Sequence, residues 1–508
     1  NMEKLEQDAA DIFHQGFACS ESVIYAIRKH FGIDLSDDAI AMSSGFPWGL
    51  GGGGCICGAL AGGTMCIGYF FGRRTPGDPK IQRCFALTKE LHDFFRDSFK
   101  SPCCGVLIRG YAKDAPERKE LCTKIVTGIV QRRNDHMTIY RQARPEERNE
   151  YVDLANHTFG FDIEELLPKV YYKGDHSDRI TKEAETESGK LEAENAVLPQ
   201  TVHASGKTLL ANFLGIMVVD PKYRGEGHMK ELMKLQLEEM SGQYHISILG
   251  GQRQRYEYFG YTSGGVQYRY HINISNIRHA LKDTDNNEIL FSPFFEIAGW
   301  EKLLPRIFAS REVYVERNLD TLQSLFTSYH QHPWGIQKNG TLIGYLISSE
   351  DHSTVSELAL LSPQDTKKVI KAYFHQFHLK SSSFLFPEYE VAICKEFSDF
   401  AEYYQIQPSN MYNIFDFAAV LDMFLTVKSR TCGLSDGIFS AVMDHQPITI
   451  TVCQNHVRVE SHAAKDAVHL SKMDAQKLLL TPYGRYMELS VPLDWFPLPL
   501  FWYTVDCF

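Results

Sequence analysis

The segment VVDPKYRGEGHMKELM, residues 218–233, decides the fold of a large part of this chain. The apolar run before it is typical of a buried strand, and the methionines after its glycines share one face of a helix. Backbone N–H groups at the start of such a helix can cradle a pyrophosphate. Gly225 and Gly227 allow the backbone to approach the ligand, and Arg224 adds positive charge. A surface turn explains most R-G-x-G tetrapeptides, but the flanking strand and helix favour a coenzyme A site.

A second apolar strand, YHISILGG at residues 244–251, follows that helix. Strand, glycine turn, helix and strand form an α/β layout, in which a cofactor binds at the carboxyl edge of the strand. We also expect a strand at MTIYRQA, residues 137–143, and a hairpin with Asn339 and Gly340 at its turn. The acidic stretch at residues 173–190 is expected to be exposed and mobile.

The glycine loop resembles the acetyl-CoA loop of GNAT N-acetyltransferases, R-x-x-G-x-G/A, with Met229 in place of the last small residue. YRGEGHMKELM at 223–233 is similar to the Eis-like (enhanced intracellular survival) branch of these enzymes, in which an apolar residue is common at that position. GGQRQRYEYFGY at 250–261 is similar to the G-x-Y-x-x-F-G-Y segment of the same branch. The resemblance implies that Tyr256 is the proton donor, with Tyr258 and Tyr261 on either side of it.

The resemblance covers residues 137–508 and implies the domain organisation. It implies two tandem GNAT-like domains at 137–265 and 266–409, and a sterol-carrier-protein-like domain at 410–508. With a helical, cysteine-rich domain at 2–131, the expected fold class is mixed α+β and α/β. It also implies a homo-oligomer, often a hexamer, and acetyl-CoA as cosubstrate. The implied acetyl-CoA contacts are Met217, Val218, Val219, Arg224, Gly225, Glu226, Gly227, His228, Met229, Lys230, Gly251 and Gln252.

Acetyl transfer to an amine sets three chemical requirements. The acceptor ammonium, with a pKa near 10, must lose a proton before it attacks. The thioester carbonyl must be polarised, which a strand N–H such as that of Val219 could do. The departing CoA thiolate must receive a proton, which a neighbouring tyrosine can give. Among the acidic residues, no Asp or Glu stands out in the sequence as the base.

The last eight residues of the sequence, FWYTVDCF at 501–508, are unusually apolar. From the residues alone, these aromatics pin the terminus into the core. The resemblance implies more, because the base of that family is a C-terminal α-carboxylate on a phenylalanine, which here is Phe508. Burial among aromatic groups would raise the low pKa of such a carboxylate and improve it as a proton acceptor.

Eight of the twelve cysteines precede residue 123. The spacing resembles a small helical family with the pattern C_GCAxxG_C_C, to which redox activity is attributed, over residues 2–131. A helix is expected at residues 20–32, ending on Gly32. Cys19 lies at its start, where the helix dipole would lower the thiol pKa and favour the thiolate, as a redox couple or a soft-metal site requires. The alternative is a set of buried structural thiols. The matching cysteines are Cys19, Cys57, Cys104 and Cys122.

Composition limits the class of partner, the presence of a membrane span and the location of the protein. The formal net charge of −11 argues against a nucleic-acid partner and suits a cationic small molecule or a basic peptide. No charged residue lies between Asp38 and Arg73, but dense glycine favours a buried helix there over a membrane span. The first residues show no signal peptide, so a cytoplasmic location is expected.

The function these patterns favour is acetyl-CoA-dependent N-acetylation of an amine, with an aminoglycoside, a polyamine or a lysine side chain as acceptor. The alternative is a redox- or metal-responsive binding protein whose GNAT region is mainly a scaffold.

Overall fold

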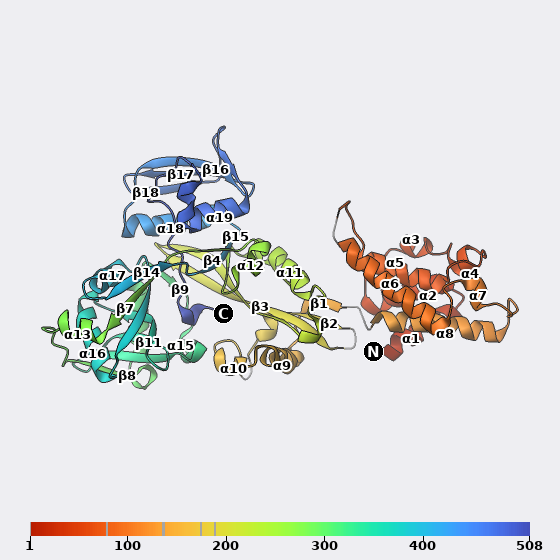
Figure 1. Ribbon diagram of the computed structural model, residues 1–508, viewed down its shortest axis with the longest axis horizontal. Coiled ribbons are helices and arrows are strands. Elements are labelled where there is room, and N and C mark those ends of the chain that lie inside the picture. The colour runs from red at the N-terminus through yellow and green to blue at the C-terminus, as the bar shows by residue number, and fades with distance from the viewer. Residues whose placement is uncertain (1, 78–79, 135–137, 173–174, 187–188) are drawn as a thin grey trace. The chain divides into compact units, whose positions relative to one another are not determined.

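The structure is a computed structural model of the 508-residue chain, and it describes residues 2–77, 80–134, 138–172, 175–186 and 189–508. The chain divides into two compact units. Unit 1 comprises Asn1–Tyr140 and Ala184–Glu192, and unit 2 comprises Arg141–Glu183 and Ala193–Phe508. Helices dominate the first part of the chain, and three sheets with their covering helices follow (Figure 1). The expected mixture of a helical N-terminal region and α/β architecture is therefore confirmed.

Unit 1 is built on helices that bury a shared apolar core. The predicted helix at 20–32 is confirmed, since α2 ends where Gly32 adopts a left-handed φ of 58°. Helix α5 packs closely on α2, because a Cβ at Gly62 would lie 2.6 Å from the Ser20 carbonyl oxygen. No helix in the described ranges is long and apolar enough to cross a membrane. The helices are α1 (Met2–His14), α2 (Cys19–Phe31), α3 (Asp37–Ala41), α4 (Pro47–Leu50), α5 (Gly58–Phe71), α6 (Lys80–Phe99), α7 (Cys104–Leu107) and α8 (Pro116–Asn134).

The first sheet has the strand order β1-β2-β3-β4-β5-β15-β6, with β9 pairing β3. Strands β3 and β4 form a long antiparallel hairpin, and β4 then pairs in parallel with β5 after the crossover helix α11. This confirms the predicted strand, glycine loop, helix and strand. The elements are β1 (Thr138–Gln142), α9 (Arg148–Phe159), α10 (Ile163–Leu166), β2 (Thr181–Thr186), β3 (Leu191–Ala204), β4 (Lys207–Val219), α11 (His228–Gln243), β5 (Ile246–Leu249), α12 (Arg253–Tyr256), β6 (Thr262–Gly264), β9 (Val313–Val315) and β15 (Asn410–Ile414).

The second sheet, of seven strands, has the order β14-β7-β13-β12-β11-β10-β8. The predicted hairpin is confirmed, because Lys338 pairs with Thr341 across a turn in which Asn339 and Gly340 have φ values of 49° and 78°. The elements are β7 (Gln267–Asn273), α13 (Ile274–His279), β8 (Ile289–Pro293), α14 (Leu303–Ser310), α15 (Leu322–Thr327), β10 (His332–Lys338), β11 (Thr341–Ser348), β12 (Thr354–Leu360), α16 (Thr366–Gln376), β13 (Ser381–Pro387), α17 (Val391–Ser398) and β14 (Tyr403–Gln407).

The third sheet has four strands in the order β18-β17-β16-β19. Before reaching it the chain returns to the first sheet, where β15 pairs with both β5 and β6. After it, the chain comes back to β4 (Figure 1). The elements are α18 (Phe417–Thr431), β16 (Gly437–Met443), β17 (Gln446–Cys453), β18 (His456–Glu460), β19 (Val468–Leu470) and α19 (Lys472–Leu480).

The acidic stretch at 173–190 differs from its expectation of exposure. In its described part, Thr181, Glu183 and Ala184 on β2 have no exposed surface. The burial of Glu183 is offset by Arg141 on β1, whose Nη1 lies 3.2 Å from Glu183 Oε2. A cation from a strand distant in sequence thus allows this acidic segment to enter the sheet, which composition alone does not reveal. Residues 173–174 and 187–188 lie outside the described residues.

Candidate active site

The site is centred on a divergence between two parallel strands. β4 and β5 pair only where Ala211–Phe213 lies beside Ile246–Ile248, although β4 continues to Val219. A β-bulge in β4, where Ile216 has a φ of 48°, turns that strand further. The expected cofactor contacts Met217, Val218 and Val219 lie on β4 beyond the divergence. Gly251 and Gln252 follow the end of β5. The two predicted groups of contact residues therefore border the same opening.

The glycine loop lies at the end of β4 and leads into α11. Gly225 and Gly227 have φ values of 91° and 94°, and nothing lies within 4 Å of where a Cβ would be on either. Gly227 is the N-cap of α11, so the unsatisfied N–H groups of the first helical turn face the loop. Arg224, Glu226 and Lys230 are exposed there. The loop thus has the open backbone and the partial positive charge that a pyrophosphate requires.

His228 and Met229, the other two predicted contacts of this loop, lie on the inner side of α11. The His228 side chain is buried, and its Nε2 lies 3.6 Å from Glu226 Oε2. Met229 packs against the apolar cluster between α11 and the sheet. This packing gives a physical reason for an apolar residue at the position that is small in other GNAT loops.

Tyr256 ends α12 and is 9% exposed. Its ring lies on Gly251, since a Cβ there would be 2.5 Å from Tyr256 Cε2. Burial raises the pKa of Tyr256, and Arg255 offsets part of that rise. The two neighbouring candidates are placed differently. Tyr258 is 69% exposed, whereas Tyr261 is fully buried with its hydroxyl 2.8 Å from Ser247 Oγ.

The Phe508 residue lies against β4. A Cβ at Gly215 would be 2.9 Å from both the carbonyl carbon and the carbonyl oxygen of Phe508. The Phe508 ring lies 6.4 Å from the ring of Tyr171, and both side chains are buried. Leu214, the neighbour of Gly215 on β4, packs in the same cluster as Tyr256. Because adjacent strand residues point to opposite faces, Tyr256 and Phe508 approach the sheet from opposite faces.

A network of polar contacts fixes the segment before Phe508. Arg317 Nε and Nη2 donate to the two carboxylate oxygens of Asp506 at 2.9 and 2.7 Å. Lys169 Nζ donates to the carbonyls of Val505, at 2.6 Å, and of Cys507. Burial lowers the pKa of Lys169 to about 8, although nearby Cys507 and Asp506 oppose that shift. The segment at residues 505–507 is therefore held at a defined place by groups from distant parts of unit 2.

An acidic side chain that no sequence pattern singled out lies across β4 from the opening. Glu194 on β3 pairs with Val218 on β4 and is 1% exposed. Both of its carboxylate oxygens lack a hydrogen-bond partner among the described residues. Burial raises the pKa of Glu194 well above its usual range, and the neighbouring Glu183 raises it further. The signal in the sequence was a carboxylate within the apolar strand LEAENAV at 191–197.

The four cysteines singled out in unit 1 come close enough to influence one another electrostatically. Cys19 begins α2, as predicted, but the expected thiolate is wrong. Burial raises the pKa of Cys19 to about 11 and that of Cys57 to about 12, and neighbouring thiols add to both shifts. Burial also raises the pKa of Cys104 and Cys122. The helix dipole is too weak to offset this loss of hydration.

These thiols are all unpaired. Within the described ranges, no group of three or more His, Cys, Asp or Glu side chains is arranged to hold a metal ion.

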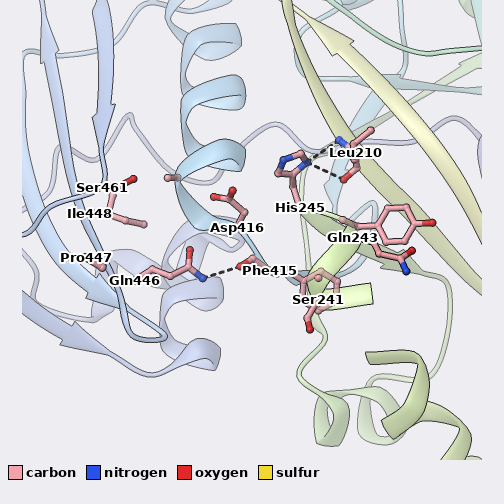
Figure 2. A pocket seen from close by; sticks show the side chains of 13 residues that line it. Leu210, Ser241, Gln243, His245, Phe415, Asp416, Gln446, Pro447, Ile448 and Ser461 are labelled. Carbon is pink, nitrogen blue, oxygen red and sulfur yellow. Dashed lines mark hydrogen bonds between the residues drawn. The ribbon is translucent and has the colours of Figure 1, made fainter. Parts of the chain in front are cut away.

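A separate cavity of about 550 Å³ lies at the other end of β5. Figure 2 shows His245, which precedes β5, facing Asp416 at the start of α18. Leu210 N donates to His245 Nδ1 at 2.9 Å, and Gln446 Nε2 donates to the Phe415 carbonyl at 2.8 Å. Gly251 and the glycine loop lie beyond the opposite end of the strand, so this cavity is distinct from the site described above.

Two family models match the chain in succession. Residues 17–135 match the family described as "Putative redox-active protein (C_GCAxxG_C_C)". Residues 139–264 match the acetyltransferase (GNAT) domain. The chain thus carries a C_GCAxxG_C_C domain followed by a GNAT acetyltransferase domain, which confirms the resemblance to these two families over these residues.

Two solved structures of other proteins share the fold, and a third is similar at a lower score. A GCN5-related N-acetyltransferase from Anabaena variabilis ATCC 29413 is 15% identical, with a TM-score of 0.53; the match covers 73% of this chain and all of that one. A conserved protein from Enterococcus faecalis V583 is 16% identical, with a TM-score of 0.52, over 71% of this chain and 95% of its own. Eis1 from Mycobacterium abscessus is 16% identical, with a TM-score of 0.47, over 69% of this chain and 92% of its own.

Proposed function

We propose that this protein transfers the acetyl group of acetyl-CoA directly to an amine. The acceptor is a small cationic amine or a lysine side chain, of the aminoglycoside, polyamine or protein-lysine type. The observation that carries the proposal is the opening between β4 and β5, bordered by the glycine loop on one side and by Tyr256 on the other. The GNAT match over residues 139–264 supports acetyl-CoA as the cosubstrate.

The residues present fit coenzyme A. Open space at Gly225 and Gly227 leaves their backbone free to approach a pyrophosphate, and Arg224 is exposed beside them. Met217, Val218 and Val219 would line the pantetheine arm along β4, with the Val219 N–H polarising the thioester carbonyl. Gly251 and Gln252 would close the opposite side. Glu226, His228, Met229 and Lys230 complete the proposed cofactor contacts.

In the proposed chemistry, Tyr256 is the proton donor and the Phe508 α-carboxylate is the proton acceptor. Tyr256 gives a proton to the departing thiolate, and its burial beside Gly251 places the hydroxyl group out of bulk water. The Phe508 carboxylate accepts a proton from the acceptor nitrogen. Their approach from opposite faces of the sheet leaves the thioester between the donor and the acceptor of protons.

We further propose that the second sheet is a second GNAT-like domain without a cofactor site. Its β12 and β13 are parallel and flank α16, as β4 and β5 flank α11. The connection LSPQD at 361–365, however, contains no glycine and no arginine. Residues 410–508 are proposed to form a sterol-carrier-protein-like domain, and the active form to be a homo-oligomer.

The alternative of a redox- or metal-responsive protein with an inactive GNAT region is less well supported. The raised pKa values of Cys19 and Cys57 disfavour the thiolate that such chemistry needs.

Release of free CoA from acetyl-CoA tests the proposal. The full chain, reduced and then oxidised, should be assayed with a panel of aminoglycosides, polyamines and lysine peptides. Acceptor-dependent CoA release, with the acetylated product identified by mass spectrometry, is the expected result. Absence of turnover with every amine, together with stoichiometric metal binding, would favour the alternative.

A further inference from the structure

Glu194 is a buried carboxylate for which the proposed function gives no role. It is 1% exposed, and neither of its oxygens has a hydrogen-bond partner among the described residues. A buried carboxylate in this condition is costly unless a ligand or a proton satisfies it. The hydroxyl of Tyr171 is likewise buried without a partner there. Burial raises the pKa of Tyr171 well above its usual range, and the nearby Glu194 is the next largest cause.

Strand register places Glu194 on the same face of the sheet as Phe508. Ala196 pairs with Gly215, and the Cβ position of Gly215 points at Phe508. Paired residues share a face, and so do residues two apart on a regular strand, so Glu194 and Ala196 face Phe508 together. Glu194 lies about 7 Å from Ala196 along β3.

The bulge in β4 determines which of its later residues share this face. Between the pairs Ala196–Gly215 and Glu194–Val218, β4 has one residue more than β3. The extra residue restores Val218 to the face of Gly215, so that Glu194 stands opposite a predicted acetyl-CoA contact. A buried carboxyl group thus lies on β3, across β4 from the opening between β4 and β5.

We propose that Glu194 is a further catalytic residue, which receives the ammonium group of the acceptor and removes its first proton. The inference rests on the proposed function and specifies its acceptor subsite as one for a cationic primary amine. Tyr171 supplies a second oxygen to the same ammonium group. Glu183, the acidic neighbour of Glu194, is held by Arg141 and therefore does not compete as strongly for the cation.

The proton balance requires two acceptors and one donor. The ammonium R–NH₃⁺ gives one proton to Glu194 and becomes R–NH₂. As the N–C bond forms and the C–S bond breaks, the nitrogen gives its second proton to the Phe508 carboxylate. Tyr256 gives one proton to the thiolate. Resetting the three groups releases one net proton to solvent, which is the stoichiometry of amine acetylation by a thioester.

The test compares Glu194→Gln with wild type, using 1,4-diaminobutane and acetyl-CoA between pH 7 and pH 9.5. At pH 7, kcat/KM for the amine should fall at least about 100-fold. The ratio of wild-type to variant kcat/KM should shrink at least tenfold by pH 9.5. The reason is that the free amine, which needs no base, becomes abundant as the pH nears an amine pKa of about 10. Acetyl-CoA affinity should stay within about twofold. The titratable and charged groups that act on Glu194 or on its neighbour Tyr171 are unchanged in this variant: Glu183, Tyr171, Tyr151, Asp175 and Arg148.

Glu388→Gln is the matched control. Glu388 follows β13, its Oε2 is buried without a hydrogen-bond partner, and burial raises its pKa, yet it belongs to the second sheet region. The kcat/KM of the Glu388→Gln variant should equal that of wild type at each pH. If kcat/KM of Glu194→Gln is reduced by the same factor at every pH, or is not reduced at all, Glu194 is not a catalytic residue. Either result would leave the proposed function intact.

Tyr171→Phe provides a second variant in case Glu194→Gln does not fold. It should raise KM for the diamine severalfold with little change in acetyl-CoA affinity. An unchanged KM would count against the subsite. If wild type acetylates no amine at all, the proposed function fails, and this inference fails with it.

Discussion

Gly215 and Phe508 are in direct contact, and no side chain fits between them. A Cβ at Gly215 would be 2.9 Å from the Phe508 carbonyl carbon, a distance that real Cβ atoms essentially never show. The contact joins the last residue of the sequence to the strand on which acetyl-CoA is proposed to bind. A methyl group added at Gly215 would therefore displace Phe508.

Gly215→Ala should therefore displace Phe508. Turnover should fall at least about tenfold, since a displaced proton acceptor no longer reaches the acceptor nitrogen. Acetyl-CoA affinity, measured by calorimetry, should change much less. Gly242→Ala is the control, because nothing lies within 4 Å of a Cβ at Gly242. Equal losses in both variants would show that the contact has no special role.

Tyr256→Phe should lower kcat by about 100-fold or more, because the thiolate loses its proton donor. The ring remains on Gly251, so acetyl-CoA binding should persist. Tyr258→Phe, at an exposed position, should behave as wild type. Steady-state kinetics of CoA release distinguishes the two variants, and an unaffected rate in Tyr256→Phe removes the donor assignment.

Gly225→Ala should weaken acetyl-CoA binding about tenfold. An L-residue at a φ of 91° is strained, so the loop backbone would move away from the pyrophosphate. Gly206→Ala carries a comparable strain at a φ of 77° in the turn between β3 and β4, away from the loop. Calorimetric titration with CoA should show weaker binding only for Gly225→Ala, and similar affinities in the two variants would contradict the loop assignment.

The sequence predicted the elements whose signals are local. The strand, glycine loop and helix at 218–233 are correct, as are the end of α2 at Gly32 and the turn at Asn339 and Gly340. Each depends on neighbouring residues, such as an apolar period or a glycine with positive φ. Pyrophosphate binding by the glycine loop is also a local prediction, because it needs only two glycines and the start of a helix.

The errors came from groups that meet only in the folded chain. Glu183 and Glu194 looked like ordinary charged residues, and their burial depends on Arg141 and on strand pairing. Cys19 looked activated by its helix, but core packing buries it and raises its pKa. In each case, residues distant in sequence bury the group, and the loss of hydration affects its pKa more than its neighbours in the sequence do.

The buried pair of Glu357 with Arg317 predicts a pH dependence of stability. Arg317 and Arg311 lower the pKa of Glu357 to about 2, despite burial, which alone would raise it. Because the unfolded value is about 4.3, this stabilisation is present above that pH and is lost as the pH falls toward 2. Urea unfolding at successive pH values should show a smaller loss of unfolding free energy in Glu357→Gln than in wild type. Equal losses in the two proteins would contradict the prediction.

The most direct test of the account replaces only the α-carboxylate of Phe508. Ligation of the dipeptide Cys-Phe-amide to residues 1–506 restores Cys507 and Phe508 and changes the carboxylate to a carboxamide. The same ligation with Cys-Phe acid is the control. At pH 7 the amide protein should bind acetyl-CoA as the control does but turn over at least about 100-fold more slowly. Equal kcat values for the two ligated proteins would contradict the role of Phe508 as proton acceptor.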